Sequence, residues 1–225
     1  GRHASQLGTA TTTGNPPGSG AAISGSPGTC GAASIPSGTS AIGINTAIDV
    51  NNIGNAGTIA FWYRSNANWD DRNSRMLFDA SNDLGNPVQD KHFFLIKEGS
   101  GSLRFALEDT SDTDSRASSV AYNFAANVWH HIAVSWDLPA NRLYIYLDGN
   151  TSPVASSVTA SNGVLGDMAP LYFGAQHMTK INGIPAGYTA NSANGDIDEI
   201  RLYNRALTPL EIEALAGLVH ACAAT

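Results

Sequence analysis

The chain has 225 residues, a length that fits one domain, and only 14% of them are charged, against roughly 25% in an average soluble domain. Its net charge is −7, and its 12 Lys and Arg form no cluster, which argues against a nucleic-acid partner. The 23 glycines argue against a helical bundle, and no apolar run reaches the roughly 18 residues of a membrane span.

Residues 1–40 carry a single formal charge, at Arg2, and are rich in Gly, Ser, Thr and Pro. Small, flexible residues of this kind cannot build a core, so the segment is interpreted as a flexible tail or linker. We therefore place one domain at residues 41–225. We also expect this sequence to be part of a larger polypeptide, without a signal peptide of its own.

Short segments with a period-two alternation follow along the domain, and each predicts a β-strand. These segments are 58–64, 75–79, 92–97, 102–108, 129–136, 142–147, 171–173 and 196–203. Turn residues separate them, such as Pro139 with Asn141, and Asp148 with Gly149. Strands this short and this numerous predict an all-β fold, a two-sheet antiparallel jelly-roll sandwich.

One helix is predicted near the C-terminus. Thr208 is an N-cap residue, Pro209 suits the first helical position and Glu211 completes a capping box. Gly217 ends the helix. We expect this helix to plug the sandwich rather than to carry function.

The two cysteines, Cys30 and Cys222, lie near opposite ends of the chain. A disulfide between them would close a loop of about 190 residues and stabilise the fold by about 5 kcal/mol in the chain-entropy model. Such a bond implies an oxidising location, either extracellular, on the cell surface or periplasmic. The alternative is two unrelated free thiols.

One loop combines an aromatic ring with planar polar groups, the combination that glycan binding requires. Trp69 falls between two strands, and a second loop at 176–194 carries Tyr188. The predicted ligand-binding residues are Trp69, Asp70, Asp71, Arg72, Asn73 and Tyr188. The alternative is that Trp69 only covers a sheet edge.

Asp198 is the candidate metal ligand. Strict alternation places it on the same strand face as Ile200 and Leu202, where an unpaired carboxylate is costly. Its partner could be a structural Ca²⁺ ion, and the alternative is a hydrogen-bonded aspartate. A second acidic run, from Glu108 to Asp114, is interpreted as a solvated loop.

Catalysis is not expected. Asp196 and Asp198 could form an acid/base pair, but Glu199 falls on the opposite face, and the pattern suggests a packed interior. His130 and His131 also point to opposite faces and cannot chelate one metal together; we expect one ring inside and one exposed.

Five motifs in order resemble a known family: Gly57-Thr-Ile-Ala-Phe-Trp-Tyr63, Trp129-His-His-Ile-Ala-Val134, Leu143-Tyr-Ile-Tyr-Leu-Asp-Gly149, Leu171-Tyr-Phe-Gly174 and the segment 195–207. Together they are similar to the laminin-G-like, concanavalin A-like jelly rolls of bacterial surface proteins. The resemblance implies glycan or protein binding without catalysis. His220-Ala-Cys222 further resembles the lectin-like region of mannose-sensitive haemagglutinin (MSHA)-type pilus biogenesis proteins.

The sequence therefore favours a non-catalytic recognition domain of a larger cell-surface or pilus-associated protein, with a glycan or a surface protein as partner. Two alternatives stay open. One is a structural spacer without a ligand, and the other is a glycoside hydrolase of concanavalin-like fold.

Overall fold

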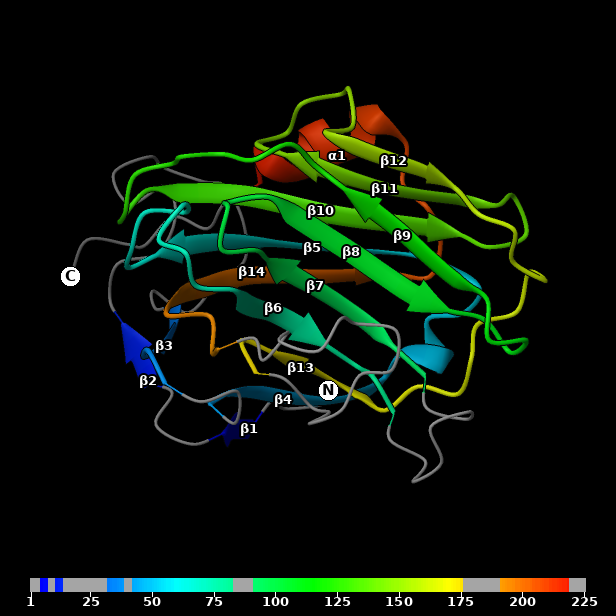
Figure 1. The fold of residues 1–225 in the computed structure, drawn as a ribbon, viewed down its shortest axis with the longest axis horizontal. Helices are drawn as coiled ribbons and strands as arrows, with labels where there is room; N and C mark the ends of the chain where they lie inside the picture. Colours follow the sequence, from blue (N-terminus) through cyan, green and yellow to red (C-terminus); the bar gives the residue numbers. More distant parts are fainter. Residues whose placement is uncertain are drawn as a thin grey trace.

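Two antiparallel sheets pack face to face in the computed structural model, which describes residues 5–7, 11–13, 32–38, 42–82, 91–175 and 191–218 (Figure 1). In spatial order, sheet A contains β1 (Ser5–Leu7), β4 (Gly43–Asp49), β13 (Pro170–Phe173), β6 (Arg75–Asp79), β7 (Phe93–Lys97), β8 (Leu103–Glu108) and β9 (Asp114–Ser118). Sheet B contains β12 (Ala155–Val158), β11 (Arg142–Leu147), β10 (Trp129–Asp137), β5 (Ala56–Ser65), β14 (Gly195–Tyr203), β3 (Ala32–Ile35) and β2 (Thr11–Thr13). The predicted all-β sandwich is confirmed.

Every segment predicted from alternation contains a strand, and these strands form the centre of both sheets. The alternation also sets which residues face inward. On β5, Ile59, Phe61 and Tyr63 are fully buried between the sheets, whereas Trp62 and Arg64 point to the other side of sheet B. The sequence did not predict β4, β9 or β12, because these strands are short or rich in small polar residues.

The predicted boundary at residue 41 is wrong for three segments. Strand β3 pairs with β14, β2 pairs with β3, and β1 pairs with β4. Ala32 and Ile35 of β3 are fully buried. Small uncharged residues look like a linker in composition, but their backbones can still complete the hydrogen bonding of a sheet edge, and β14 offers such an edge.

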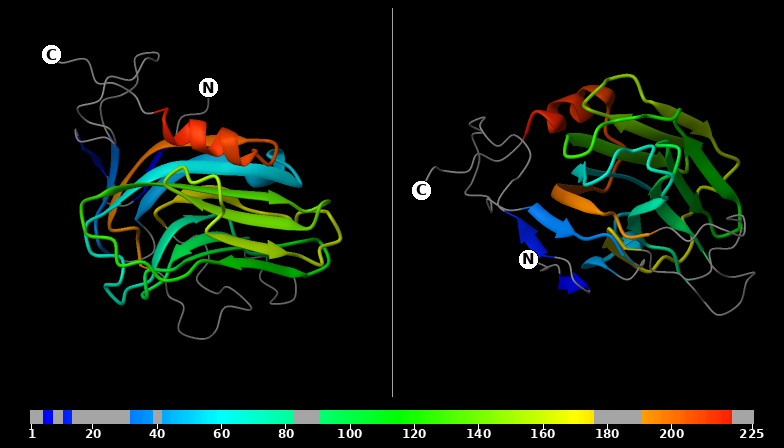
Figure 2. Two further views of the ribbon diagram at one scale, coloured as in Figure 1. Left: turned by 90° about the horizontal axis from the view of Figure 1, so that it is seen from above. Right: turned by 60° about the vertical axis from the view of Figure 1, so that its left-hand side comes forward.

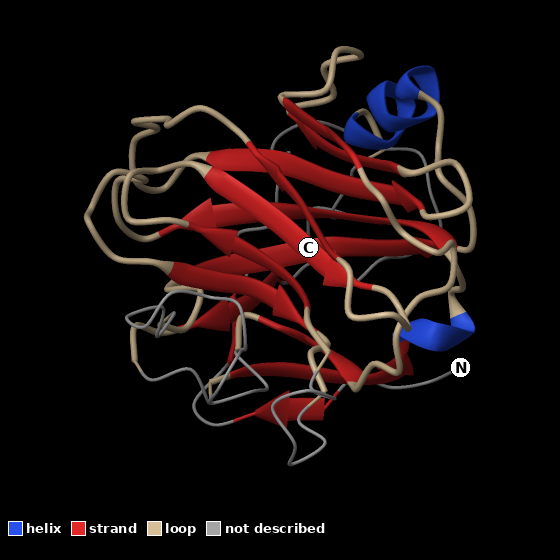
Figure 3. Ribbon diagram, turned by 45° about the vertical axis from the view of Figure 1, so that its right-hand side comes forward, coloured by secondary structure: helices blue, strands red, loops and turns tan. Residues whose placement is uncertain are grey.

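Aromatic rings from both sheets fill the interior. Phe61 of β5 contacts Phe173 and Phe78 of sheet A, with ring centroids 5.3 and 6.2 Å apart. Phe93 of β7 lies 5.2 Å from Trp136 of β10 in an edge-to-face arrangement. These pairs join the two layers seen in Figure 3 and make the interior of the sandwich a packed core rather than a binding cavity.

The predicted helix is confirmed as α1 (Pro209–Ala216), with the capping box of Thr208 and Glu211 formed as expected. A short 3₁₀ helix, η1 (Val50–Asn52), follows β4. Helix α1 lies on the outer face of sheet B (Figure 2), where Ile212 and Leu215 pack against Ala60, Ala133 and other residues. Among the described residues, no helix is long and apolar enough to cross a bilayer.

Candidate functional site

Trp69 of the β5–β6 loop is a core residue, so its prediction as an exposed sugar-binding ring is wrong. Its exposed fraction is 0%, and its ring contacts those of Tyr63, Phe124 and His130. The loop folds inward here because the backbone N–H of Trp69 donates to the carbonyl oxygen of Phe124. Trp69 therefore anchors the β5–β6 loop to the segment that contains Phe124.

Asp71 is engaged in holding the same loop. Its carboxylate accepts hydrogen bonds from Lys97 Nζ at 2.8 Å and Arg75 Nη2 at 2.7 Å, and both of these cationic side chains are buried. Lys97 Nζ also donates to the carbonyl oxygen of Trp69 at 2.6 Å. Burial alone would raise the pKa of Asp71, but the bonds from Lys97 and Arg75 lower it to about 2. Asp71 is therefore a structural ion-pair centre.

The other predicted ligand residues have two fates. Three of them are exposed on the loop surface: Asp70, Arg72 and Asn73. Because Trp69 is buried, no exposed aromatic ring of this loop accompanies them. Tyr188 lies outside the described residues, as do both cysteines of the predicted disulfide, Cys30 and Cys222. For these three residues the predictions stay as they were.

Asp198 lies on the outer face of sheet B, and the predicted shared face with Ile200 and Leu202 is wrong. Asp198 pairs with Trp62 across β5, whereas Leu202 pairs with the inward-facing Ile59. The register shifts between Asp198 and Arg201, and Glu199 in between has φ of 54°. This β-bulge reverses the alternation, which a period-two pattern cannot anticipate.

The carboxylates near Asp198 are engaged by N–H donors. Asp198 Oδ1 accepts from the backbone of Glu199 at 2.8 Å, and the Glu199 side chain pairs with Arg201 at 2.7 Å. In the described part of the chain, no group of three or more His, Cys, Asp or Glu side chains could hold a metal ion. Calcium at Asp198 stays a prediction, which a melting curve with and without EDTA tests.

The acidic run from Glu108 to Asp114 forms a structured turn rather than a freely solvated loop. Asp109 is fully buried, and its two carboxylate oxygens accept backbone N–H groups from Ser111, Thr113 and Asn162. These bonds lower the pKa of Asp109 although burial opposes them. Its carboxylate therefore pins two loops together through backbone N–H groups.

Beside that turn, His92 is buried between two carboxylates on the outer side of sheet A. Its Nε2 lies 2.8 Å from Asp114 Oδ1, and its Nδ1 lies 3.1 Å from Glu108 Oε2. Burial alone would lower the pKa of His92, but its bonds to Asp114 and Glu108 raise it above the ordinary value of 6.5. The two carboxylates therefore hold the histidine, although its Nδ1 does not have hydrogen-bond geometry toward Glu108.

A different set of side chains forms a grid on the outer face of sheet B. Two cross-strand rows run across β14, β5 and β10: Asp196 faces Arg64, which faces Trp129, and Asp198 faces Trp62, which faces His131. We call these six residues the Trp62 patch. The next outward positions along β5 and β10, Ala60 and Ala133, lie against α1, so the patch begins where the helix contact ends.

The patch contains four buried nitrogen atoms that have no hydrogen-bond partner. They are the indole Nε1 atoms of Trp62 and Trp129 and both ring nitrogens of His131. The rings of Trp62 and His131 lie edge to face at 5.4 Å, and His131 is only 1% exposed. Buried polar groups are almost always paired in folded proteins, so these four atoms, out of eleven such atoms among the described residues, mark the patch as a place where the fold leaves polar groups unsatisfied.

His131 is neutral at physiological pH. Burial, reinforced by the positive charge of Arg201, lowers its pKa from 6.5 to about 4. A neutral imidazole has one N–H donor and one acceptor nitrogen, and both ring nitrogens of His131 are buried without a partner. His130 points to the opposite face as predicted, but neither ring is exposed, which corrects the expectation for His131.

Arg64 lies between Asp196 and Trp129 in the other row of the patch. Its Nε donates to Asp196 Oδ2 at 2.8 Å, a second guanidinium nitrogen contacts the same oxygen, and its Cζ lies 4.9 Å from the centroid of the Trp129 ring. This cation–π contact and the ion pair hold the Arg64 side chain across the Trp129 ring. The pairing also uses Asp196, one of the two carboxylates considered for catalysis.

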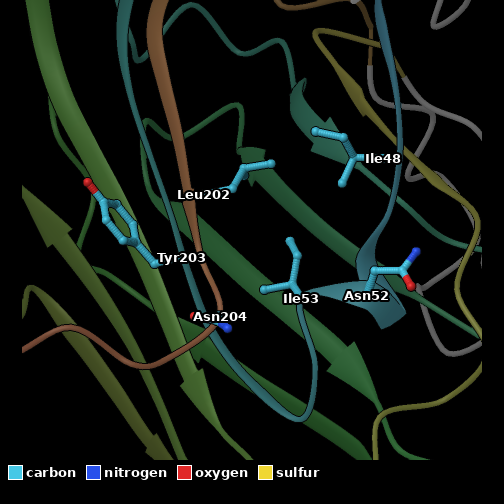
Figure 4. A pocket seen from close by; sticks show the side chains of 6 residues that line it. All are labelled: Ile48, Asn52, Ile53, Leu202, Tyr203 and Asn204. Carbon is cyan, nitrogen blue, oxygen red and sulfur yellow. The ribbon is translucent and has the colours of Figure 1, made fainter. Parts of the chain in front are cut away.

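A pocket at the sandwich edge is the other candidate (Figure 4). It has a cavity volume of about 380 Å³ and is lined by Ile48, Asn52, Ile53, Leu202, Tyr203 and Asn204. Figure 4 shows the aliphatic side chains turned toward one another, while the Tyr203 ring points away from them. None of the buried unpartnered nitrogen or oxygen atoms among the described residues belongs to this lining, so the pocket shows no comparable demand for a polar ligand.

Sequence reasoning missed the Trp62 patch, although part of the signal is present. Alternation on β5 puts Trp62 and Arg64 on the face opposite the core residues, and alternation on β10 does the same for Trp129 and His131. A tryptophan facing away from the core on each of two strands is the signal that could have found the site. The alignment of the two strands in register, with Asp196 opposite Arg64, is seen only in the structure.

Comparisons with known proteins agree with this fold. Over 90 residues the chain is 28% identical to the rat (Rattus norvegicus) "Sushi, von Willebrand factor type A, EGF and pentraxin domain-containing protein 1"; the match covers 40% of this chain and spans only 2% of that relative's length. The CBM40 domain of the Ruminococcus gnavus IT-sialidase superposes with a TM-score of 0.61 at 17% identity, covering 82% of this chain and 96% of that one.

A second similar structure is domain 4 of AbnA, a GH43 extracellular arabinanase from Geobacillus stearothermophilus, in complex with arabinotriose. Its TM-score is 0.55 at 19% identity, and the superposition covers 93% of this chain and 89% of that domain. At these identities the likeness concerns the fold alone. The sequence profile of the concanavalin A-like lectin/glucanases superfamily (Laminin_G_3) matches residues 36–213, most of the chain, so the chain belongs to this family.

Proposed function

We propose that this protein is a non-catalytic glycan-recognition domain and that the Trp62 patch is its binding face. The observation that carries the proposal is a pair of half-buried tryptophans, Trp62 and Trp129, that face outward on neighbouring strands beside the Arg64–Asp196 ion pair. Sugar hydroxyls both donate and accept hydrogen bonds, and sugar C–H faces pack on aromatic rings. A face that combines two outward-facing tryptophan rings with an arginine–aspartate pair supplies both kinds of contact.

Similar structures support a glycan as the ligand class. The CBM40 domain has been crystallised with α2,3 and α2,6 sialyllactose, and the arabinanase domain with arabinotriose. The family includes both lectins and glucanases, so membership alone does not choose between binding and hydrolysis. We favour binding because Asp196, one carboxylate of the potential acid/base pair, is held in the ion pair with Arg64.

We further propose that the domain is part of a larger bacterial cell-surface protein and lies outside the cell or in the periplasm. A pilus-associated role rests on the resemblance of His220-Ala-Cys222 alone and is part of the same proposal. The alternatives are a protein partner on the same face and a spacer domain without a ligand, and a negative result in the following experiment would favour them.

The test is a glycan array probed with the wild type and with Trp62→Ala, Trp62→Phe and Trp129→Ala. We expect the alanine variants to lose at least about tenfold in affinity, since removing a central aromatic contact costs more than 1 kcal/mol. Trp62→Phe keeps an aromatic ring at this position but replaces the larger indole, so an intermediate loss of affinity is expected. Circular dichroism and the melting temperature must show that each variant is folded.

Tyr172→Ala is the matched control, because Tyr172 is a half-buried aromatic residue facing outward on sheet A. Equal binding by wild type and Trp62→Ala, or a loss confined to Tyr172→Ala, would exclude the Trp62 patch. A wild type that binds no glycan would favour the spacer or a protein partner. Release of reducing ends from polysaccharides that disappears in a folded Asp198→Asn variant would instead establish an enzyme.

A further inference from the structure

Both arginines at the Trp62 patch already have carboxylate partners. Arg64 donates to Asp196 at 2.8 Å while its guanidinium lies over the Trp129 ring at 4.9 Å. Arg201, next along β14, donates to Glu199 Oε2 and to the carbonyl oxygen of Leu218, each at 2.7 Å. Arg64 and its neighbour Arg201 are therefore both occupied, and Arg142, which also faces outward on sheet B, lies at the far end of β11 from the patch.

Recognition of an acidic sugar requires the opposite arrangement. A carboxylate on a ligand is stabilised by an unpaired arginine that can donate two hydrogen bonds to it. Burying the carboxylate without such a partner is costly. At the Trp62 patch an incoming anion would have to compete with Asp196 for Arg64 and with Glu199 for Arg201. Of the other patch residues, Trp62, Trp129 and the neutral His131 carry no charge and Asp198 is a carboxylate, so none of them favours an anion.

We infer that the Trp62 patch selects neutral oligosaccharides and discriminates against sialylated or otherwise acidic forms of the same glycan. This inference rests on the proposed function, because it names the ligand class of the same face. The CBM40 domain, in contrast, has been crystallised with sialyllactose, an acidic sugar. Similarity of fold to that domain does not specify the charge of the ligand of this chain.

The test is an array that presents each neutral oligosaccharide beside its sialylated form, read at 50 and 500 mM salt. We expect every bound glycan to be held at least about tenfold more tightly in its neutral form, with little change between the two salt concentrations. Sialylated forms bound equally well or better, with Trp62-dependent binding intact, would overturn the neutral preference and leave the proposed function standing. No binding by any glycan would overturn the proposed function itself.

Two variants examine the arginine directly. Asp196→Asn frees Arg64 from its carboxylate, and we expect the neutral-to-sialylated affinity ratio to fall at least threefold; an unchanged ratio in a folded variant would count against the inference. Asp70→Asn makes the same charge change on the exposed loop and should leave the ratio as in the wild type. If Asp196→Asn does not fold, Arg64→Gln serves instead: a selective loss of sialylated ligands would show that Arg64 reads an anion and would refute the inference.

Discussion

Acidification provides a direct test of the environment assigned to His131. This side chain is 1% exposed on the outer face of sheet B, and its two ring nitrogens have no partner. The charged groups that act on it are Arg201 of β14, which disfavours the protonated ring, and Asp148 after β11, which favours it. Burial is the largest effect and, together with Arg201, lowers the pKa to about 4.

The sign follows from proton binding by the two states. Between pH 6.5 and pH 4 the unfolded chain holds a proton on His131 that the folded chain does not, so lowering the pH favours unfolding. With pKa values of 6.5 unfolded and about 4 folded, the free energy of unfolding falls by about 2 kcal/mol between pH 7.5 and pH 5. Above pH 7.5 this residue contributes no further pH dependence.

Urea denaturation of the wild type and of His131→Phe, at pH 5.0, 6.0 and 7.5, measures this contribution. Phenylalanine removes the titratable ring and both unpaired nitrogens, so the variant should lack about 2 kcal/mol of the acid destabilisation of the wild type. His131→Gln provides a second non-titrating variant. Other titrating groups are common to all three proteins and cancel in the difference. Parallel pH profiles for wild type and both variants would refute the assigned burial of His131.

Three further predictions concern stability. His92 has the opposite sign: its raised pKa stabilises the fold fully below pH 6.5, and this stabilisation is lost as the pH rises through the folded pKa, so His92→Gln should be most destabilising at pH 5 to 6 in urea titrations. Asp71→Asn leaves buried Lys97 without its carboxylate and should cost about 3–5 kcal/mol of unfolding free energy, whereas exposed Asp70→Asn should change it by less than about 0.5; equal effects would disprove the ion-pair role. Thr208→Ala removes the N-cap of α1 and should cost about 1 kcal/mol, measured by thermal melting, and an unchanged melting temperature would mean that α1 does not stabilise the sheet.

The sequence predicted the elements whose signals are local. Alternation identified β5, β8 and β10, because a strand with one buried face must repeat every two residues. The capping box around Thr208 identified the start of α1, since the residues that satisfy a helix terminus are its immediate neighbours in the chain. Strands without alternation, such as β3, were missed because a sheet edge recruits them through backbone groups that every residue carries.

The errors at the candidate site have a common origin in long-range contacts. Trp69 looked exposed because it lies between strands, but Lys97 and Phe124, distant in the chain, hold its loop inward. Asp198 was assigned to the wrong face because the bulge at Glu199 reverses the alternation of β14. Neither effect leaves a mark on the residues nearby in the sequence.

The sequence by itself therefore determined the jelly-roll class, the central strands and the helix. Only the tertiary structure decided that Trp129 and His131 lie beside Trp62 and that Asp196 neutralises Arg64. The physical reason is that hydrophobic periodicity reports how each strand faces the core, whereas strand order and register depend on pairing between segments far apart in the chain. A binding face built across three strands follows from the register rather than from any one segment.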